Sequence, residues 1–414
     1  MPNVLPTPAI IADKMLEFLF EGSGVVDRVN RDYESQWEAS RDSIGKVLQI
    51  KNPPRYRSQS GPVISSVQST NFGLTAFAID QWSTVPFKLT GEEKTFNNAK
   101  ELDMWAEKNI RPLVAPLISD VEVAIFGLYN KIPNIVGTPG TGPTTWDVMG
   151  SARETMSLLQ TPQDNRICYL NPTGSKKLGG GLVSTYNPQG PLSKQYTTGK
   201  IQPIAGFDMN EANFIASHTV GSATSTGANI LTNNATPQTG SVISINTWTT
   251  GTTILKGDIV TVAGVYSVNP VTKKSTGLLR QFVVTANVTS AGNAGDLNIS
   301  PPIIVSGAFQ NVTGSTADIT GVPNGAIVTI KTGTASTAYA QNLAWWKNAI
   351  GLVTVPIAPL DGVPKSIQRT YDGISITLSS GGDIMNFETI HRLDMAFGVN
   401  AFDPYLDHII RITN

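Results

Sequence analysis

Residues 212–255 contain no Asp, Glu, Lys or Arg, although the sequence before them is normally charged. Such a change of composition within one chain marks a domain boundary. Beyond it, short strands are predicted at Ile259–Val262, Gln281–Asn287 and Ala326–Ile330, with Gly, Pro, Asn and Ser between them. This spacing is typical of a small β-barrel or β-sandwich.

A second domain surrounds this β region in the sequence. The composition changes back at Trp345 and Trp346. Periodicity predicts one helix and three strands outside the β region, at Trp146–Leu159, Arg166–Leu170, Gly373–Leu378 and Arg392–Val399. We therefore expect an α+β host domain into which the β domain is inserted, because small barrels commonly have neighbouring ends.

The N-terminal third contains the strongest helical signal. Asn98 and Glu101 form a capping-box pattern, and apolar residues follow at steps of three and four. Pro112 and Pro116 each lack an amide donor, so a kink or break is expected near Arg111.

The residues before this helix are expected to be less regular. Residues 51–95 combine prolines with alternating apolar positions, which indicates a long β-hairpin or an extended loop. A short amphipathic helix is predicted between Thr7 and Gly22. It packs either on the subunit's own core or on a neighbouring molecule.

Three Gly-containing segments are predicted to be turns or loops. Asn171-Pro172 with Gly174 indicates a turn, and Gly179–Gly181 indicates a flexible loop. Gly137–Thr145 is rich in Gly and Thr, but it lacks the Lys that a phosphate-binding loop places before its Ser or Thr. We interpret all three as structural connections.

The composition limits the class of protein. The 414 residues suffice for two or three domains, and only 15% of them are charged. A formal net charge of -1 argues against binding nucleic acid through its phosphates. Cys168 is the single cysteine, which excludes a disulfide within the chain and suits a reducing cytosol. We find no secretory signal pattern and expect no membrane-spanning segment.

The sequence shows no pattern of a catalytic or metal site. His218, His391 and His408 lack metal-ligand spacing and are expected to be structural. The nucleophile-elbow motif GxSxG is absent. Glu92 and Glu93 are adjacent, and adjacent residues of a strand point to opposite faces, so a proton-sharing acid pair is not expected. We predict no enzyme and no cofactor.

A series of short motifs follows in order along nearly the whole chain. They are Tyr169-Leu170-Asn171-Pro172, Ala205-Gly206-Phe207-Asp208, Lys256-Gly257-Asp258, Ala263-Gly264-Val265, Asn342 with Trp345, Ala349-Ile350, Pro356-Ile357, Arg392-Leu393-Asp394 and Gly398-Val399. In this order they resemble the major capsid proteins of short-tailed bacteriophages, which have the Hong Kong 97 capsid fold with an inserted domain.

The resemblance implies a subunit organisation. It comprises an N-terminal arm at 1–50, an extended loop at 51–95, a peripheral domain with a spine helix at 96–144, an axial domain at 145–221 and 346–414, and an inserted β-barrel at 222–345. It also implies a function. Such proteins assemble in the host bacterial cytoplasm into an icosahedral shell of hexamers and pentamers around double-stranded DNA, with a scaffolding protein, a portal protein and possible decoration proteins.

Some charged residues are candidates for contacts between subunits. They are Lys51, Arg55, Arg57, Glu92, Glu93, Lys273 and Lys274. The basic residues either pair with acidic groups of a neighbour or form a solvated face. Arg280 is expected in the same loop as Lys273. This chain departs from the family in an early hairpin of the barrel. In the relatives that hairpin is charged and forms salt bridges with a neighbouring subunit. Residues 236–255 here carry no charge, so the resemblance does not support that contact.

The main alternative is a different virion protein, a tail or adhesin protein whose Thr-rich β domain binds a host glycan. It predicts trimers or rods with measurable sugar binding, and it gives the helix after Asn98 no role. A secreted hydrolase is a more distant alternative, because the sequence has neither a signal pattern nor a nucleophile motif.

Overall fold

The structure is a computed structural model. It describes residues 12–18, 24–32, 47–57, 62, 67–68, 72–90, 111–185, 197–223, 230–233, 236–314, 319–358, 365–371 and 374–413. Glu92, Glu93 and the helix start expected at Asn98 lie outside these residues.

The chain divides into two compact units. The first comprises Met1–Ile50, Leu74–Ile125 and Ile350–Asn400, and the second comprises Lys51–Gly73, Phe126–Ala349 and Ala401–Asn414. The expected axial domain of 145–221 with 346–414 stays a prediction.

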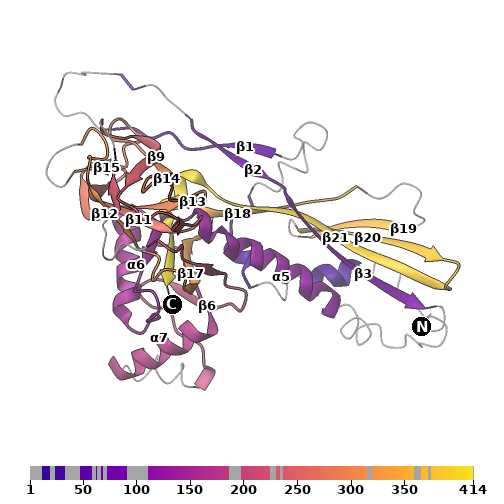
Figure 1. The fold of residues 1–414 in the computed structure, drawn as a ribbon. Coiled ribbons are helices and arrows are strands. Elements are labelled where there is room, and N and C mark those ends of the chain that lie inside the picture. The colour runs from indigo at the N-terminus through magenta and orange to yellow at the C-terminus, as the bar shows by residue number, and fades with distance from the viewer. Residues whose placement is uncertain are drawn as a thin grey trace. The chain divides into compact units, whose positions relative to one another are not determined.

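The second unit contains a closed β-barrel (Figure 1). Its strands are β8 (Ile230–Thr232), β9 (Gly240–Asn246), β11 (Ile259–Val268), β12 (Ser275–Val284), β14 (Gly295–Ile303) and β16 (Ile327–Ile330). They follow the order β12-β14-β9-β8-β16-β11, and β11 pairs back with β12 to close the ring. Three short strands lie beside it: β10 (Thr253–Ile254), β13 (Val288–Thr289) and β15 (Val312–Thr313). The barrel expected from the sequence is confirmed.

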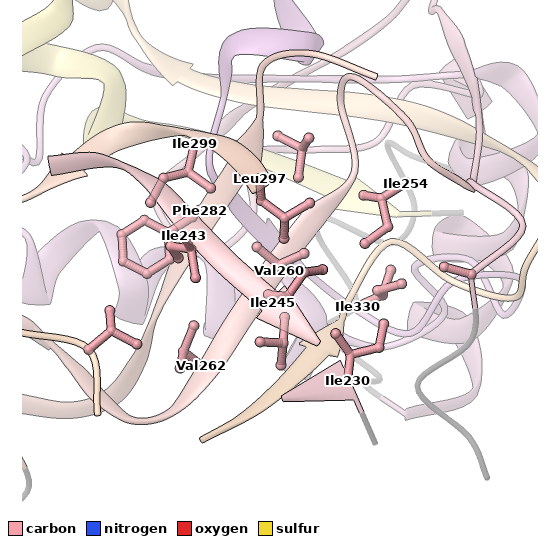
Figure 2. Close-up of a cluster of buried hydrophobic side chains, with 14 of the residues drawn as sticks. Ile230, Ile243, Ile245, Ile254, Val260, Val262, Phe282, Leu297, Ile299 and Ile330 are labelled. Carbon is pink, nitrogen blue, oxygen red and sulfur yellow. The ribbon is translucent and has the colours of Figure 1, made fainter. Parts of the chain in front are cut away.

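Alternate residues of the barrel strands fill its interior. Figure 2 shows the buried side chains, which include Ile243 and Ile245 of β9 and Val260 and Val262 of β11. Successive residues of a strand point to opposite faces, so this period of two turns one apolar row inward. Each such side chain contributes about 1.5–3 kcal/mol when it is fully buried. The barrel therefore has a hydrophobic core of its own.

A six-stranded sheet forms the rest of the second unit. Its strands are β4 (Asn134–Val136), β5 (Arg166–Leu170), β6 (Asp208–Glu211), β7 (Ser217–Thr219), β17 (Ala338–Trp346) and β22 (Ile409–Thr413). The order is β4-β22-β17-β5-β6, and β7 pairs with the start of β17. Helices α6 (Trp146–Leu158) and α7 (Pro172–Thr185) share a buried cluster with this sheet. Cys168 is fully buried in that cluster.

The turn and the flexible loop expected within 171–181 are wrong, because these residues form the start and middle of α7. Asn171 Oδ1 accepts a hydrogen bond from the Gly174 amide at 2.8 Å, which caps the helix, and Pro172 occupies its first turn. Gly181 is required for close packing, since a Cβ there would lie 1.6 Å from the Thr144 carbonyl oxygen. The glycines allow the helix to approach its neighbour.

The first unit contains a five-stranded sheet. Its strands are β3 (Gln81–Thr90), β18 (Ile350–Val355), β19 (Lys365–Tyr371), β20 (Ile374–Asp383) and β21 (Glu388–Ala401). The order is β18-β21-β20-β19, and β3 also pairs with β21. A separate pair joins β1 (Val47–Lys51) to β2 (Leu74–Ala78). Of the described strands within 51–95, β2 pairs with β1 and β3 pairs with β21.

Helix α5 (Arg111–Gly127) is the long helix of the described residues and is followed by the 3-10 helix η2 (Leu128–Lys131). Leu117 and Val121 are buried, as the periodicity predicted, and Val114 is buried beside them. The span Pro112–Lys131 is long and apolar enough to cross a membrane by length and composition alone. One such helix is weak evidence of a membrane span, because length and composition are the whole criterion.

The remaining short elements complete the fold. They are the 3-10 helices η1 (Val26–Arg28), η3 (Lys347–Ala349) and η4 (Asp403–His408). Residues 12–18 are helical, and Ala12, Met15 and Leu16 are buried there. This burial supports packing of the predicted N-terminal helix on the subunit's own core.

Candidate assembly site

Strand β17 belongs to both the barrel region and the six-stranded sheet. Near its start, Tyr339 packs into the barrel's core. Further along, β17 pairs with β22 from Gln341↔Thr413 to Trp345↔Ile409. The backbone of β17 pairs within the sheet, while the Tyr339 side chain packs in the barrel, so this strand connects the two structures.

Gln281 of the barrel also caps an edge of the sheet. Its side-chain oxygen accepts a hydrogen bond from the Ile135 amide at 2.6 Å, and its side-chain nitrogen donates to the Ile135 carbonyl at 3.1 Å. Ile135 lies in the edge strand β4. The amide group of Gln281 thus provides the pair of bonds that a neighbouring strand would otherwise make.

Arg411 is fully buried at the junction of barrel and sheet. Its Nη2 donates to the Gly257 carbonyl at 2.8 Å and its Nη1 to Gln341 Oε1 at 3.4 Å. Its guanidinium carbon lies 5.8 Å from the centre of the Tyr129 ring. Burial lowers the pKa of Arg411 to about 9, so the group stays protonated at neutral pH and needs these partners.

Asp258 supplies the negative charge of the same junction. Its carboxylate is fully buried and contacts His218 Nε2 at 2.9 Å. It also accepts hydrogen bonds from the amides of Leu255 at 2.8 Å and Gly221 at 3.1 Å. His218 is therefore structural, as predicted. No group of three or more His, Cys, Asp or Glu in the described residues could hold a metal ion.

The structure brings together basic residues that lie far apart in the sequence. Arg55 is half-buried and its Nη2 donates to the Pro404 carbonyl at 3.0 Å, while Arg57 is exposed. Lys273 is buried, and burial together with the charges of Arg55 and Arg57 lowers its pKa to about 8. These three predicted contact residues thus form one basic cluster in the second unit.

The interpretation of Lys273 and Arg280 as residues of a surface loop is corrected by their burial. Lys273 Nζ donates to the Ala308 carbonyl at 2.6 Å within the same chain. Arg280 lies in β12, and its Nη2 pairs with Asp407 Oδ1 at 2.7 Å. Both charges are retained inside the subunit because internal acceptors replace water.

The other predicted basic residues lie at the surface. Lys51, Arg57 and Lys274 are exposed and therefore accessible to a neighbouring molecule. Sequence reasoning missed Arg411, Asp407 and Gln281. Only Arg411 has a visible signal, because it stands between Ile409-Ile410 and Ile412, where an unpaired charge would be expensive to bury.

The family described as "P22 coat protein - gene protein 5" matches residues 49–408, which is most of the chain. The chain belongs to this coat protein family. As a major capsid protein, it self-assembles into the multimeric shell of the virion head, and its role is structural rather than catalytic. The resemblance stated from the sequence is confirmed, and the tail or adhesin alternative is not favoured.

Two of the solved structures similar to the coat protein are named for phages. "Mycobacterium phage Che8" is 11% identical with a TM-score of 0.48, covering 94% of this chain and 90% of that one. "Capsid structure of the Cyanophage P-SCSP1u" is 13% identical with a TM-score of 0.42, covering 89% and 84%. No curated protein matches this chain. The assignment rests on the family match.

Proposed function

We propose that this coat protein has the Hong Kong 97 subunit organisation and that its barrel is an inserted domain. In this proposal, 1–50 form the arm, 51–95 the extended loop, 96–144 the peripheral domain, 145–221 with 346–414 the axial domain, and 222–345 the insertion. Many moderate contacts between copies then hold the shell together.

The pairing of β7 with β17 is the observation that carries the insertion. Thr219, before the first ring strand, pairs with Ala338, after the last ring strand. All six ring strands lie between these two residues, from Ile230 to Ile330. A domain with neighbouring ends can be added to a host strand pair without changing the host's path, so this geometry supports insertion.

The partners follow from the same proposal. Copies form the hexamers and pentamers of an icosahedral shell with the help of a scaffolding protein, a portal protein occupies one vertex, and a decoration protein binds outside. Lys51, Arg57 and Lys274 contact acidic groups of neighbouring copies. The net charge of -1 argues against tight binding to DNA phosphates. It fits a shell that encloses double-stranded DNA without sequence-specific binding.

Expression of residues 217–340 alone tests the insertion. The barrel has its own core, so we expect a monomer with β-type circular dichroism and a cooperative unfolding transition. An equally long fragment from 126 to 249 serves as the control, since it contains only two of the six ring strands and is expected to stay unfolded. A 217–340 fragment without a cooperative transition would contradict the insertion.

A loop deletion tests the role of the extended loop. The Asn52 amide donates to the Gly73 carbonyl at 2.8 Å, so the two ends of 53–72 are neighbours and a two-residue Asn-Gly turn can join them. This change retains β1, β2 and β3. We expect a folded subunit that fails to form closed shells when it is expressed with its scaffold. Normal shells would exclude an essential role of 53–72 in assembly.

A further inference from the structure

The basic cluster of Arg55, Arg57 and Lys273 lacks a counter-ion within the described residues. None of its three side chains forms an ion pair in this part of the chain. Burial lowers the pKa of Lys273, and the positive charges of Arg55 and Arg57 lower it further. Neighbouring positive charges repel one another, so an anion from outside the chain would stabilise the cluster.

Segment η4 positions Arg55 and commits the carboxylate of Asp407 to another cation. Arg55 Nη2 donates to the Pro404 carbonyl at 3.0 Å. Further along the same segment, Asp407 Oδ1 pairs with Arg280 Nη2 at 2.7 Å and accepts a hydrogen bond from Asn134 Nδ2 at 3.4 Å. The Arg280 side chain is 2% exposed and depends on this carboxylate. Asp407 therefore leaves the charge of the basic cluster uncompensated.

The three side chains of the cluster range from buried to exposed. Lys273 is 6% exposed, and its Nζ donates to the Ala308 carbonyl at 2.6 Å and to the Gln310 carbonyl at 3.5 Å. An ammonium group has three donors, so one remains after these two bonds. Arg55 is half-buried and Arg57 is exposed. A small anion can approach the guanidinium groups from solvent and interact with a positive charge held in the interior.

The backbone at Arg57 is held by one side chain. The Arg57 amide donates to Gln68 Oε1 at 2.8 Å, and the Arg57 carbonyl accepts a hydrogen bond from Gln68 Nε2 at 2.6 Å. Arg55 is fixed by its hydrogen bond to Pro404. Binding costs less conformational entropy where the binding groups are already ordered, so a ligand retains more of its interaction free energy here.

We infer that the basic cluster binds the phosphate group of a small ligand, either inorganic phosphate or a phosphate monoester. Such a group carries a charge of about -1.5 to -2 near neutral pH, whereas a carboxylate or a phosphodiester carries a single charge. It therefore offsets more of the three positive charges than one carboxylate does. Guanidinium groups also form paired hydrogen bonds with phosphate oxygens. The inference goes beyond the shell-forming function and does not depend on it.

A bound phosphate joins two segments that lie far apart in the sequence. Arg55 and Arg57 follow strand β1, and Lys273 lies in the turn between β11 and β12. The shared anion replaces repulsion among these cations by attraction. We therefore expect phosphate to hold the start of 53–72 against the barrel and to stabilise the second unit.

Calorimetric titration of the unassembled subunit with inorganic phosphate tests the site. Sodium chloride keeps the ionic strength constant, because screening alone changes the repulsion within the cluster. We expect one site with a dissociation constant of roughly 1 mM. Arg57→Gln should weaken binding about tenfold, since a hydrogen bond to a charged group contributes at least that factor. Lys200→Gln, exposed and outside the basic cluster, should bind phosphate as wild type does.

Urea unfolding separates a lost site from a damaged fold. Arg57→Gln and Lys200→Gln each change one exposed side chain, so their midpoints in chloride should match wild type. Phosphate should raise the midpoint of wild type and Lys200→Gln by more than that of Arg57→Gln. Equal phosphate binding by wild type and Arg57→Gln, or no binding by wild type, would overturn the inference.

Two further probes distinguish a phosphate group from other anions. A DNA duplex without terminal phosphates and a glutamate-rich peptide carry single charges along a chain. We expect neither probe to show binding that depends on Arg57. Arg57-dependent binding of either probe, without Arg57-dependent binding of inorganic phosphate, would show that the ligand is of another class and would overturn the inference.

Discussion

Arg280 of the barrel strand β12 and Asp407 of η4 form an ion pair, with Arg280 Nη2 2.7 Å from Asp407 Oδ1. The Arg280 side chain is 2% exposed, so its charge depends on this partner. Asn134 of β4 donates to the same carboxylate at 3.4 Å. The pair ties the barrel to the C-terminal segment of the six-stranded sheet.

Breaking this pair from one side is expected to destabilise the subunit strongly. Arg280→Met removes the cation paired with Asp407, and because the Asp407 side chain is 20% exposed the loss should lie below the about 3–5 kcal/mol of a fully buried pair. Urea unfolding of the unassembled subunit measures this cost. The double variant with Asp407→Asn should lose less than the sum of the two single variants. Strictly additive losses would show that the pair is not coupled.

Gln281→Ala tests the cap on β4. It removes the partners of the Ile135 amide and carbonyl, and each unsatisfied backbone group costs about 1–3 kcal/mol. We expect a loss of about 2 kcal/mol in urea unfolding. Gln281→Glu keeps the acceptor but loses the donor, so it should lie between wild type and Gln281→Ala. Equal stability of all three proteins would exclude the capping role.

The subunit is expected to lose stability between pH 6.5 and 4. Burial lowers the pKa of His408 to about 4; Asp407 opposes this shift, whereas Arg55 and Arg166 add to it. His408 takes up a proton near pH 6.5 in the unfolded state but not in the folded state. The free energy of unfolding is therefore highest above that pH and falls by up to about 3 kcal/mol toward pH 4.

His408→Phe identifies the titrating group. The ring packs against Trp346 and Tyr405, so an aromatic replacement preserves much of the packing. Urea midpoints measured at pH 7 and pH 4.5 should differ less for His408→Phe than for wild type. Asp407 has a lowered pKa and loses its contribution only as the pH falls below about 4, outside this window. An identical pH dependence in both proteins would rule out His408.

Leu117→Asp is expected to prevent folding of the first unit. Leu117 is fully buried on α5, and an unpaired carboxylate there has no partner to offset its desolvation. Val123 of the same helix is 52% exposed, so Val123→Asp is the matched control and should remain soluble and folded. Soluble expression and circular dichroism distinguish the two. Equal behaviour would contradict the placement of the buried face of α5.

Charge reversal at the exposed basic residues tests the proposed subunit contacts. Arg57→Glu and Lys274→Glu should leave the unfolding midpoint within about 0.5 kcal/mol of wild type, because both side chains are at the surface. Shell yield should fall for each. Lys200→Glu, also exposed and outside the basic cluster, should assemble normally. Similar shell yields from all three variants would show that Arg57 and Lys274 do not contribute to subunit contacts.

The barrel could be predicted because its signal is local. Short strands such as Ile259–Val262 and Ala326–Ile330, with turn residues between them, indicate it from the sequence alone. The pairing of β3 with β21 could not be predicted, since alternation identifies a strand and not its distant partner. Helix α7 was missed because the close approach that Gly181 permits is visible only in three dimensions.

The candidate site was predicted in part. The basic residues Arg55, Arg57 and Lys273 were recognised from their charge, but their proximity depends on the folding of distant segments. Lys273 was expected outside because its acceptors are backbone carbonyls, which every sequence contains. The exposure of Ile384, Met385 and Phe387, between β20 and β21, was not recognised, since these side chains look like core residues in the sequence.

Electron microscopy of particles from cells that express this chain with its scaffolding protein tests the central claim most directly. The account predicts closed icosahedral shells in which the barrel is one rigid feature of each subunit, attached where β17 enters the six-stranded sheet. Rods, isolated trimers or soluble monomers in place of shells would contradict it.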